Sequence, residues 1–95
     1  MRNDSEAKVE AYLCERVKEL GGLCIKLNPA WYVGIPDRMV LLPGGRIGFA
    51  ELKRPKGGRL SVKQKAWQHM LANELGFTCW MIRDKHLVDL FLSLI

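Results

Sequence analysis

Apolar residues recur at helical spacing in three parts of the chain. In the first part, residues 5–20, they lie three and four positions apart, and Gly21-Gly22 marks the end. Asn3, Asp4 or Ser5 is expected to cap the start of this helix. The other two predicted helices are 61–75, which Gly76 ends, and 85–94, which Asp84 can cap. The stripe that the middle helix is expected to bury consists of Ala66, Trp67, Met70, Leu71 and Leu75.

Shorter apolar runs between these helices predict four strands, at 23–27, 35–42, 46–53 and 77–82. The order α-β-β-β-α-β-α predicts one layered α/β domain over residues 1–95. The second and third strands are joined by Pro43-Gly44-Gly45, in which proline presets the turn and glycine supplies positive φ. These two strands therefore form a predicted β-hairpin.

The hairpin brings three charged side chains together. If its loop has three residues, Leu42 pairs with Arg46, and counting outward places Asp37 opposite Glu51 with their Cβ atoms about 5 Å apart. Alternate residues of a strand share a face, so Lys53 lies beside Glu51. A surface cluster of cross-strand charges is the simpler interpretation. The surrounding strand positions are apolar, however, and charges that interrupt a core strand favour a functional role.

Two adjacent carboxylates repel each other unless a cation lies between them. Hard oxygen ligands suit Mg²⁺ or Mn²⁺, and a neighbouring lysine can hold an attacking water or offset charge that develops on a phosphate. We therefore predict a Mg²⁺ or Mn²⁺ site at Asp37 and Glu51, with Lys53 as a catalytic residue.

The same residues resemble a known family. Pro36-Asp37 followed by Glu51-Leu52-Lys53 is similar to the PD-(D/E)XK nuclease superfamily. Gly34-Ile-Pro-Asp, the Glu-Leu-Lys triplet, a glycine-rich basic loop and Ser61-x-x-Gln64 together resemble its VRR-NUC branch, over about residues 10–82. The resemblance implies a restriction-endonuclease-like αβββαβ core, a mixed sheet flanked by helices, and metal-dependent DNA cleavage. The chain looks like the small stand-alone members of phages and bacteria, which implies an endonuclease similar to Holliday-junction resolvases.

The resemblance also implies roles for residues outside the hairpin. An acidic residue of the first helix is implied as a metal ligand together with the Leu52 backbone carbonyl, and it looks like Glu10, although Glu6 and Glu15 are nearby. Gln64 is implied near the active site. It also completes an S-x-x-Q capping box with Ser61, so both interpretations stay open.

Charge and aromatic residues favour a nucleic-acid partner. The chain has 15 Lys and Arg against 10 Asp and Glu, a net charge of +5, which suits a polyanion. Residues 54–59 form a basic, glycine-rich loop that can bind phosphates, although a solvated linker would have the same composition. Two loop aromatics can stack on a base or cover the end of the sheet. The predicted DNA-binding residues are Trp31, Tyr32, Arg38, Arg54, Lys56, Arg59 and Lys63.

The remaining features predict where the protein acts. No apolar run reaches the length of a membrane span, and the first residues have no apolar signal core, so a cytoplasmic protein is expected. We expect no small-molecule cofactor.

Cys14, Cys24 and Cys79 lie in apolar segments without CxxC spacing, which favours buried hydrophobic roles over disulfides or zinc ligands.

The last helix predicts self-association. Between Leu87 and Ile95 seven of nine residues are large and apolar, which is more than one side of a helix buries. We expect a homodimer that charged substitutions at Phe91 or Leu94 disrupt, with the first helix or the Trp31 loop as alternative interfaces.

Alternative functions are a flap- or end-processing nuclease and a non-catalytic nucleic-acid-binding module. A sequence-specific restriction-type enzyme is disfavoured because 95 residues leave little room for a base-reading element.

Overall fold

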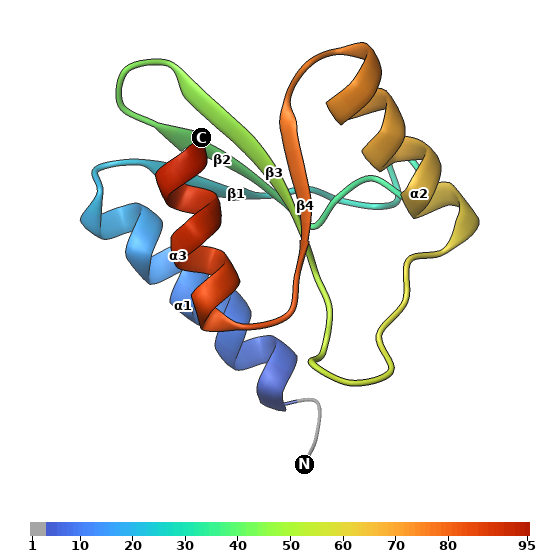
Figure 1. Cartoon of the computed structure of the whole chain (residues 1–95), viewed down its shortest axis with the longest axis horizontal. Helices are drawn as coiled ribbons and strands as arrows, with labels where there is room; N and C mark the ends of the chain where they lie inside the picture. Colours follow the sequence, from blue (N-terminus) through green and yellow to red (C-terminus); the bar gives the residue numbers. More distant parts are fainter. Residues whose placement is uncertain (1–3) are drawn as a thin grey trace.

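The computed structural model describes residues 4–95 and contains a four-stranded sheet flanked by helices (Figure 1). The elements in chain order are α1 (Asp4–Glu19), β1 (Leu23–Lys26), β2 (Arg38–Leu42), β3 (Arg46–Leu52), α2 (Val62–His69), the π-helix η1 (Met70–Glu74), β4 (Thr78–Ile82) and α3 (Lys85–Leu94). The predicted order of helices and strands is confirmed, and so is the α/β class. Asn3, one candidate cap of α1, lies outside the described residues.

The sheet has the order β1-β2-β3-β4 and is mixed. The pairs β1–β2 and β2–β3 are antiparallel, whereas β4 runs parallel to β3 because α2 and η1 lie in the connection between them. The predicted hairpin register is confirmed, with Leu42 opposite Arg46 and Met39 opposite Phe49. Gly44 and Gly45 have φ angles of 84° and 75°, so the turn needs residues without a Cβ.

The main core lies between α1, α3 and one face of the sheet. Its largest fully buried side chains are Phe91, Leu13, Leu52, Ile82, Val17, Val40 and Val88. Gly48 lets α3 approach the sheet, because a Cβ at this position would lie 2.7 Å from Cζ of Phe91. Packing on this face therefore fixes β3, which ends with Glu51 and Leu52 and is followed directly by Lys53.

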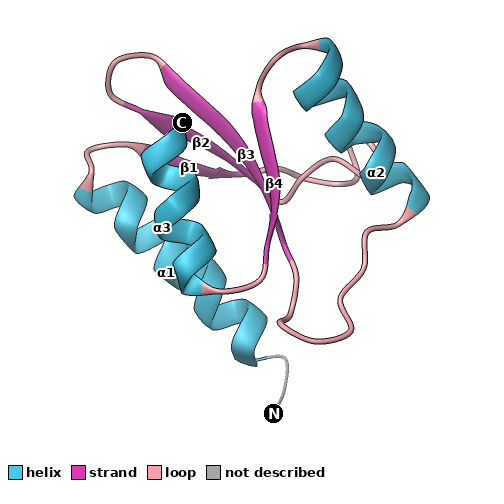
Figure 2. Cartoon of the chain, viewed as in Figure 1, coloured by secondary structure: helices cyan, strands magenta, loops and turns pink. Residues whose placement is uncertain are grey.

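α2 lies on the other side of the sheet from α1 and α3 (Figure 2), and its predicted burial is wrong in part. Leu71 is buried, but Ala66 and Leu75 are exposed. The predicted α-helix also ends in a π turn, in which Leu75 N donates to Met70 O at 2.9 Å. η1 packs on β4, whereas α2 itself contains no buried residue. The apolar face of α2 is therefore incompletely covered.

α3 uses most of its apolar residues in the core. Val88, Phe91 and Leu92 are buried, whereas Leu90 and Leu94 are 42% and 60% exposed. The expectation that Phe91 belongs to a dimer interface is therefore wrong, because its ring is enclosed between α3 and the sheet. Among residues 4–95 no helix, α3 included, has the length and apolar character needed to cross a membrane.

Two of the cysteines join α1 to β1. Cys14 Sγ lies 3.3 Å from Cys24 Sγ, and both thiols are half-buried, while Cys79 is buried. Burial, with the hydrogen bond and charge of Cys14 adding to it, raises the pKa of Cys24 to about 12, and burial raises that of Cys79 to about 11. Cys24 and Cys79 are therefore protonated at neutral pH and act as packing groups.

Candidate active site

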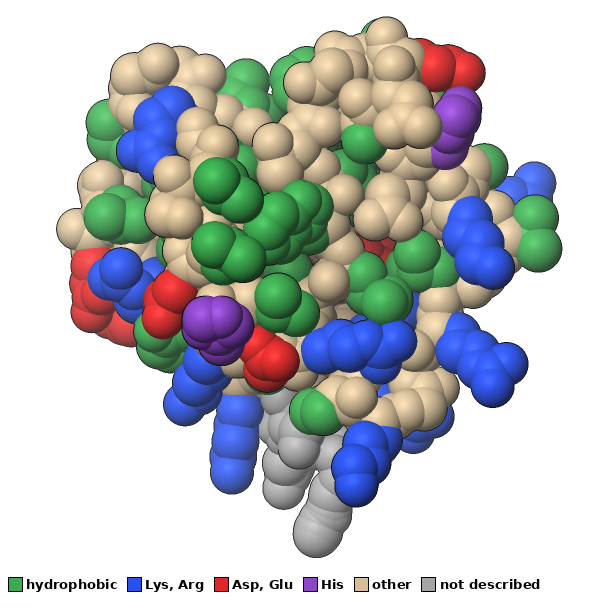
Figure 3. Space-filling model, in the orientation of Figure 1, with side chains coloured by type: hydrophobic (Ala, Val, Ile, Leu, Met, Phe, Trp, Pro, Cys, Tyr) green, Lys and Arg blue, Asp and Glu red, His purple; other side chains and the backbone are tan. Residues whose placement is uncertain are grey.

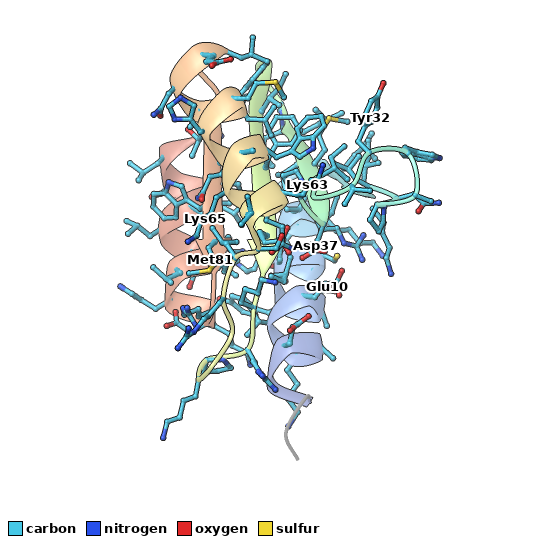
Figure 4. All side chains as sticks on the ribbon, turned by 90° about the vertical axis from the view of Figure 1, so that its right-hand side faces the viewer. Glu10, Tyr32, Asp37, Lys63, Lys65 and Met81 are labelled. Carbon is cyan, nitrogen blue, oxygen red and sulfur yellow. The ribbon has the colours of Figure 1, made fainter. Side chains whose placement is uncertain are left out.

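The predicted catalytic residues meet where β3 ends. Asp37 directly precedes β2, and its Oδ2 accepts a hydrogen bond from Leu52 N at 2.7 Å. This bond ties the carboxylate to the end of β3, beside Glu51. In Figure 4 Asp37 lies close to the start of α2. The hairpin register thus brings the two carboxylates together at one end of the sheet.

Glu51 is a buried carboxylate with one oxygen in use. Glu51 is only 6% exposed. Oε2 accepts a hydrogen bond from Gln64 Nε2 at 2.9 Å and lies 3.7 Å from Lys53 Nζ. Oε1 is buried without a hydrogen-bond partner among the described residues. A buried acceptor left unpaired is costly, so this oxygen is available to a ligand.

The electrostatics of the pair favour a cation. Burial, together with the charge of Asp37 and a hydrogen-bonding contact with that side chain, raises the pKa of Glu51 to about 8, while Lys53 acts in the opposite direction. The site therefore holds negative charge poorly by itself. A divalent cation beside the two carboxylates would remove that penalty.

The side-chain amide of Gln64 makes two hydrogen bonds, one through its oxygen and one through its nitrogen. Its Oε1 accepts from Ser61 N at 2.8 Å, and its backbone N donates to Ser61 Oγ at 3.1 Å, which completes the predicted capping box. Its Nε2 donates to Glu51. The two interpretations of this glutamine are therefore compatible, because capping orients the side chain that contacts the carboxylate.

Glu10 and Arg38 form an ion pair. Arg38 Nε lies 2.8 Å from Glu10 Oε2, and Arg38 Nη1 donates to Cys24 O at 3.1 Å. The structure thus places Arg38 in a half-buried contact instead of on an open basic surface. Among the side chains that the structure describes, those of residues 6–95, no group of three or more acidic, histidine or cysteine residues is arranged to hold a metal. Figure 4 shows Glu10 on α1 and Asp37 in the same part of the view, but Glu10 is paired with Arg38, and the α1 carboxylate whose charge raises the pKa of Glu51 is Glu6.

Three comparisons relate this geometry to known proteins. No family model matches the chain. A protein named "Putative nuclease p44", from Acyrthosiphon pisum secondary endosymbiont phage 1, is 40% identical over 55 residues, which are 58% of this chain and 59% of that protein. The match thus spans less than two thirds of the relative.

A solved structure described as "VRR_NUC domain" has a TM-score of 0.81 to this chain at 30% sequence identity. The match covers 94% of this chain and 95% of the solved one, so it includes the sheet, the helices and the site residues. The chain belongs to the VRR-NUC family. Both the predicted family and the predicted fold, with its C-terminal helix, are confirmed.

Several exposed cations of this VRR-NUC chain lie in the loop that follows the carboxylate pair and on α2, and others lie on α1 and α3. Figure 3 shows Lys and Arg side chains grouped over the loop between β3 and α2 and over the start of α2. Of the predicted DNA-binding residues, Arg54, Lys56, Arg59 and Lys63 are exposed in this region. This surface, which we call the basic loop surface, can contact phosphates on the two sides of a bond held at the carboxylates.

The two loop aromatics do not cover the end of the sheet. Trp31 and Tyr32 are 63% and 62% exposed. The ring of Tyr32 packs edge-on against Trp67 with centroids 5.5 Å apart, and Trp67 Nε1 donates to Val33 O at 3.1 Å. Tyr32 is thereby attached to α2, and in Figure 4 it projects outward from its loop. Exposed rings of this kind are available for stacking.

The carboxylate pair of this VRR-NUC chain fits a hard divalent cation. Asp37 and Glu51 supply carboxylate oxygens, and Glu51 Oε1 is buried and unpartnered in the described part of the chain. Such oxygens are the ligands that Mg²⁺ and Mn²⁺ prefer. Leu52, whose carbonyl the resemblance implies as a further ligand, is the last residue of β3 and directly follows Glu51.

Sequence reasoning gave no role to Arg83, which contacts the loop between β3 and α2. Its guanidinium donates to the carbonyls of Arg54 at 3.1 Å and Gly58 at 2.6 Å. A lone arginine after a strand has no distinguishing pattern, and its partners are backbone atoms. These contacts depend on the fold and could not be found in the sequence.

Proposed function

We propose that this VRR-NUC chain is a Mg²⁺- or Mn²⁺-dependent endodeoxyribonuclease. The observation that supports this most strongly is Glu51, a buried carboxylate with an unpartnered oxygen beside Asp37 and Lys53. A purely structural cluster would satisfy both oxygens. The likeness to a nuclease-named phage protein and to a VRR-NUC structure supports the same proposal.

Asp37, Glu51 and the Leu52 carbonyl would hold the ion. When bound, a divalent ion offsets charge on the phosphate and lowers the pKa of a water. Glu10 is proposed as a further ligand. Because Arg38 contacts only Oε2 of Glu10, the second oxygen of this carboxylate is free of that ion pair.

Lys53 and Gln64 act on the reacting groups. The Lys53 ammonium, 3.7 Å from Glu51, is placed to orient the attacking water and to stabilise charge on the phosphate in the transition state. Gln64 Nε2 donates to the same Oε2 of Glu51 that Lys53 approaches, which orients the carboxylate in the site. The basic loop surface positions the DNA strand for in-line attack.

Removal of Lys53 tests this mechanism. Lys53→Ala is expected to lower the cleavage rate by a factor of about 10² or more while folding and DNA binding persist. Lys18→Gln is the matched control, because Lys18 is an exposed lysine on α1 outside the site. Cleavage is measured under single-turnover conditions and folding by circular dichroism. Cleavage by Lys53→Ala at the wild-type rate would contradict the mechanism.

We further propose that the substrate is branched DNA, with a four-way junction as the leading candidate and a flap or free end as the alternative. The exposed aromatics and the loop cations contact backbone and unstacked bases without reading a duplex sequence. A labelled four-way junction, a flap, a splayed arm and a plain duplex are compared at equal concentration. Cleavage of one duplex sequence in preference to all branched substrates would refute this proposal.

The alternative is a non-catalytic nucleic-acid-binding module with the same fold. Calorimetric titration with Mn²⁺ separates the two functions, because a nuclease needs the carboxylates as ligands. We expect heat with the wild-type protein and much less with Asp37→Asn. Equal heats for the two proteins would favour the binding module.

We also propose a homodimer. The apolar side chains that stay exposed indicate where its interface can lie. Besides Trp31 and Tyr32, which are proposed to contact DNA, the large apolar residues that remain exposed include Val33, Val62, Leu75, Leu90 and Leu94. The first three lie just before Gly34, at the start of α2 and just after η1, and the other two lie on α3. A second copy would cover such a surface. Light scattering should give a mass near twice 10.8 kDa, and a monomer at micromolar concentration would refute the dimer.

A further inference from the structure

Arg83 connects the end of β4 to the loop between β3 and α2. Its Nη2 donates to Gly58 O at 2.6 Å, and its Nη1 donates to Arg54 O at 3.1 Å and Pro55 O at 3.5 Å. Three carbonyls of one loop thus converge on one planar guanidinium. The side chains of Arg54, Lys56 and Arg59 are exposed, so the loop presents its cations while these carbonyls are tied to Arg83.

The same loop packs on the stem of Lys53. Gly58 is buried, and a Cβ added to it would lie 3.0 Å from Lys53 Cβ and 3.2 Å from Arg54 O. The backbone of Lys53 is held from the β4 side, since Lys53 N donates to Ile82 O at 3.0 Å. Lys53 therefore lies between β4 and Gly58, and Arg83 binds the carbonyl of that same glycine.

We propose that Arg83 is a positioning residue for Lys53. By binding the carbonyls of Arg54, Pro55 and Gly58, it closes the loop onto the Lys53 stem and keeps the ammonium beside Glu51. This inference rests on the proposed nuclease function for its effect on cleavage, but the closed loop itself does not depend on catalysis. A displacement of a catalytic group by about 1 Å can lower a rate by a factor of about 10².

The competing role is a direct contact of Arg83 with a DNA phosphate. The two roles predict different results when lysine replaces Arg83. Lysine keeps the positive charge but lacks the planar fork that reaches several acceptors at once. A phosphate contact would survive Arg83→Lys, whereas the bridge to three carbonyls would not.

The test compares Arg83→Gln, Arg83→Lys and Gly58→Ala with the charge control Lys18→Gln. Trypsin reports on loop closure, because Lys56 and Arg59 are exposed cleavage positions in the loop. In Arg83→Gln we expect tryptic cleavage at these two positions to become at least about tenfold faster and the single-turnover DNA cleavage rate to fall about 10- to 100-fold. The Kd for DNA, measured without divalent metal, should stay within about threefold of the Kd of the control.

Arg83→Lys should retain the wild-type Kd without regaining the wild-type cleavage rate or protection from trypsin. Gly58→Ala keeps Arg83 and moves the Lys53 stem, so it should lower the cleavage rate in a protein with normal thermal unfolding. If Arg83→Gln does not fold, Arg83→Lys decides the question. Wild-type protection and cleavage in either Arg83→Gln or Arg83→Lys, or a wild-type rate in Gly58→Ala, would overturn the proposal.

The two hypotheses fail separately. If the wild-type protein cleaves none of the DNA substrates, the proposed function fails, and trypsin protection still decides whether Arg83 closes the loop. If the wild-type protein cleaves DNA but the loop of Arg83→Gln remains protected, the nuclease proposal stands and the role of Arg83 is refuted.

Discussion

The buried carboxyl of Glu51 predicts that the metal-free protein loses stability as pH rises. Burial and the neighbouring Asp37 raise the pKa of Glu51 from 4.5 to about 8. Between these values the folded protein keeps a proton that the unfolded chain has released. The free energy of unfolding therefore decreases with pH. This contribution is complete below the unfolded pKa of 4.5 and is lost as pH rises through about 8.

The size of the effect follows from the linkage of one proton. A single proton that is bound only in the folded state gives a slope of at most about 1.4 kcal/mol per pH unit. From pH ~5.5 to ~7.5 the free energy of unfolding then falls by about 2 to 3 kcal/mol. We apply the full linkage because Glu51 is only 6% exposed. In a domain of this size a loss of 2 kcal/mol lowers Tm by about 10 °C.

Glu51→Gln is the matched variant, because glutamine keeps an oxygen acceptor for Gln64 but cannot ionise. Urea unfolding of both proteins is followed in EDTA at several pH values. We expect the wild-type protein to lose about 2 kcal/mol relative to Glu51→Gln across this interval. Parallel pH profiles for the two proteins would refute the assignment of Glu51 as a buried carboxyl that is neutral at neutral pH. Addition of Mn²⁺ near pH 8 should stabilise the wild-type protein alone.

Three further predictions concern the scaffold. Phe91→Ala should lower the free energy of unfolding by about 3 to 5 kcal/mol, because the ring is fully buried, and a loss below 1 kcal/mol in urea would contradict that burial. Gly34→Ala should lower Tm measurably, since Gly34 has φ 90° and a Cβ would lie 2.7 Å from the Lys63 backbone; an unchanged Tm would contradict this geometry. Asp84→Ala should cost about 1 kcal/mol through loss of the cap on Leu87 N, and Asp84→Asn should retain most of it.

The hairpin was predictable because its determinants are local. Pro43-Gly44-Gly45 fixes the loop length, and alternation on the strands then sets the register that places Asp37 beside the end of β3. The caps Ser61 and Asp84 are likewise short-range features and occur where the sequence places them. These elements depend on neighbours in the chain.

The contacts that sequence reasoning missed depend on tertiary packing. The pairing of Glu10 with Arg38 joins residues 28 positions apart, and its two members had been assigned separate roles. The apolar face of α2 has the spacing of a buried helix, yet η1 is the part that packs on β4. Arg83 binds backbone carbonyls, which have no signature in the side-chain sequence.

DNA cleavage shows directly whether Asp37, Glu51 and Lys53 form the site of a metal-dependent nuclease. A labelled four-way junction is incubated with the wild-type protein or Asp37→Asn, in Mn²⁺ or in EDTA, and the products are separated on a denaturing gel. We expect cleavage by the wild-type protein in Mn²⁺, none in EDTA, and a loss of at least about 100-fold in Asp37→Asn. Cleavage by Asp37→Asn at the wild-type rate, or undiminished cleavage by the wild-type protein in EDTA, would contradict this assignment.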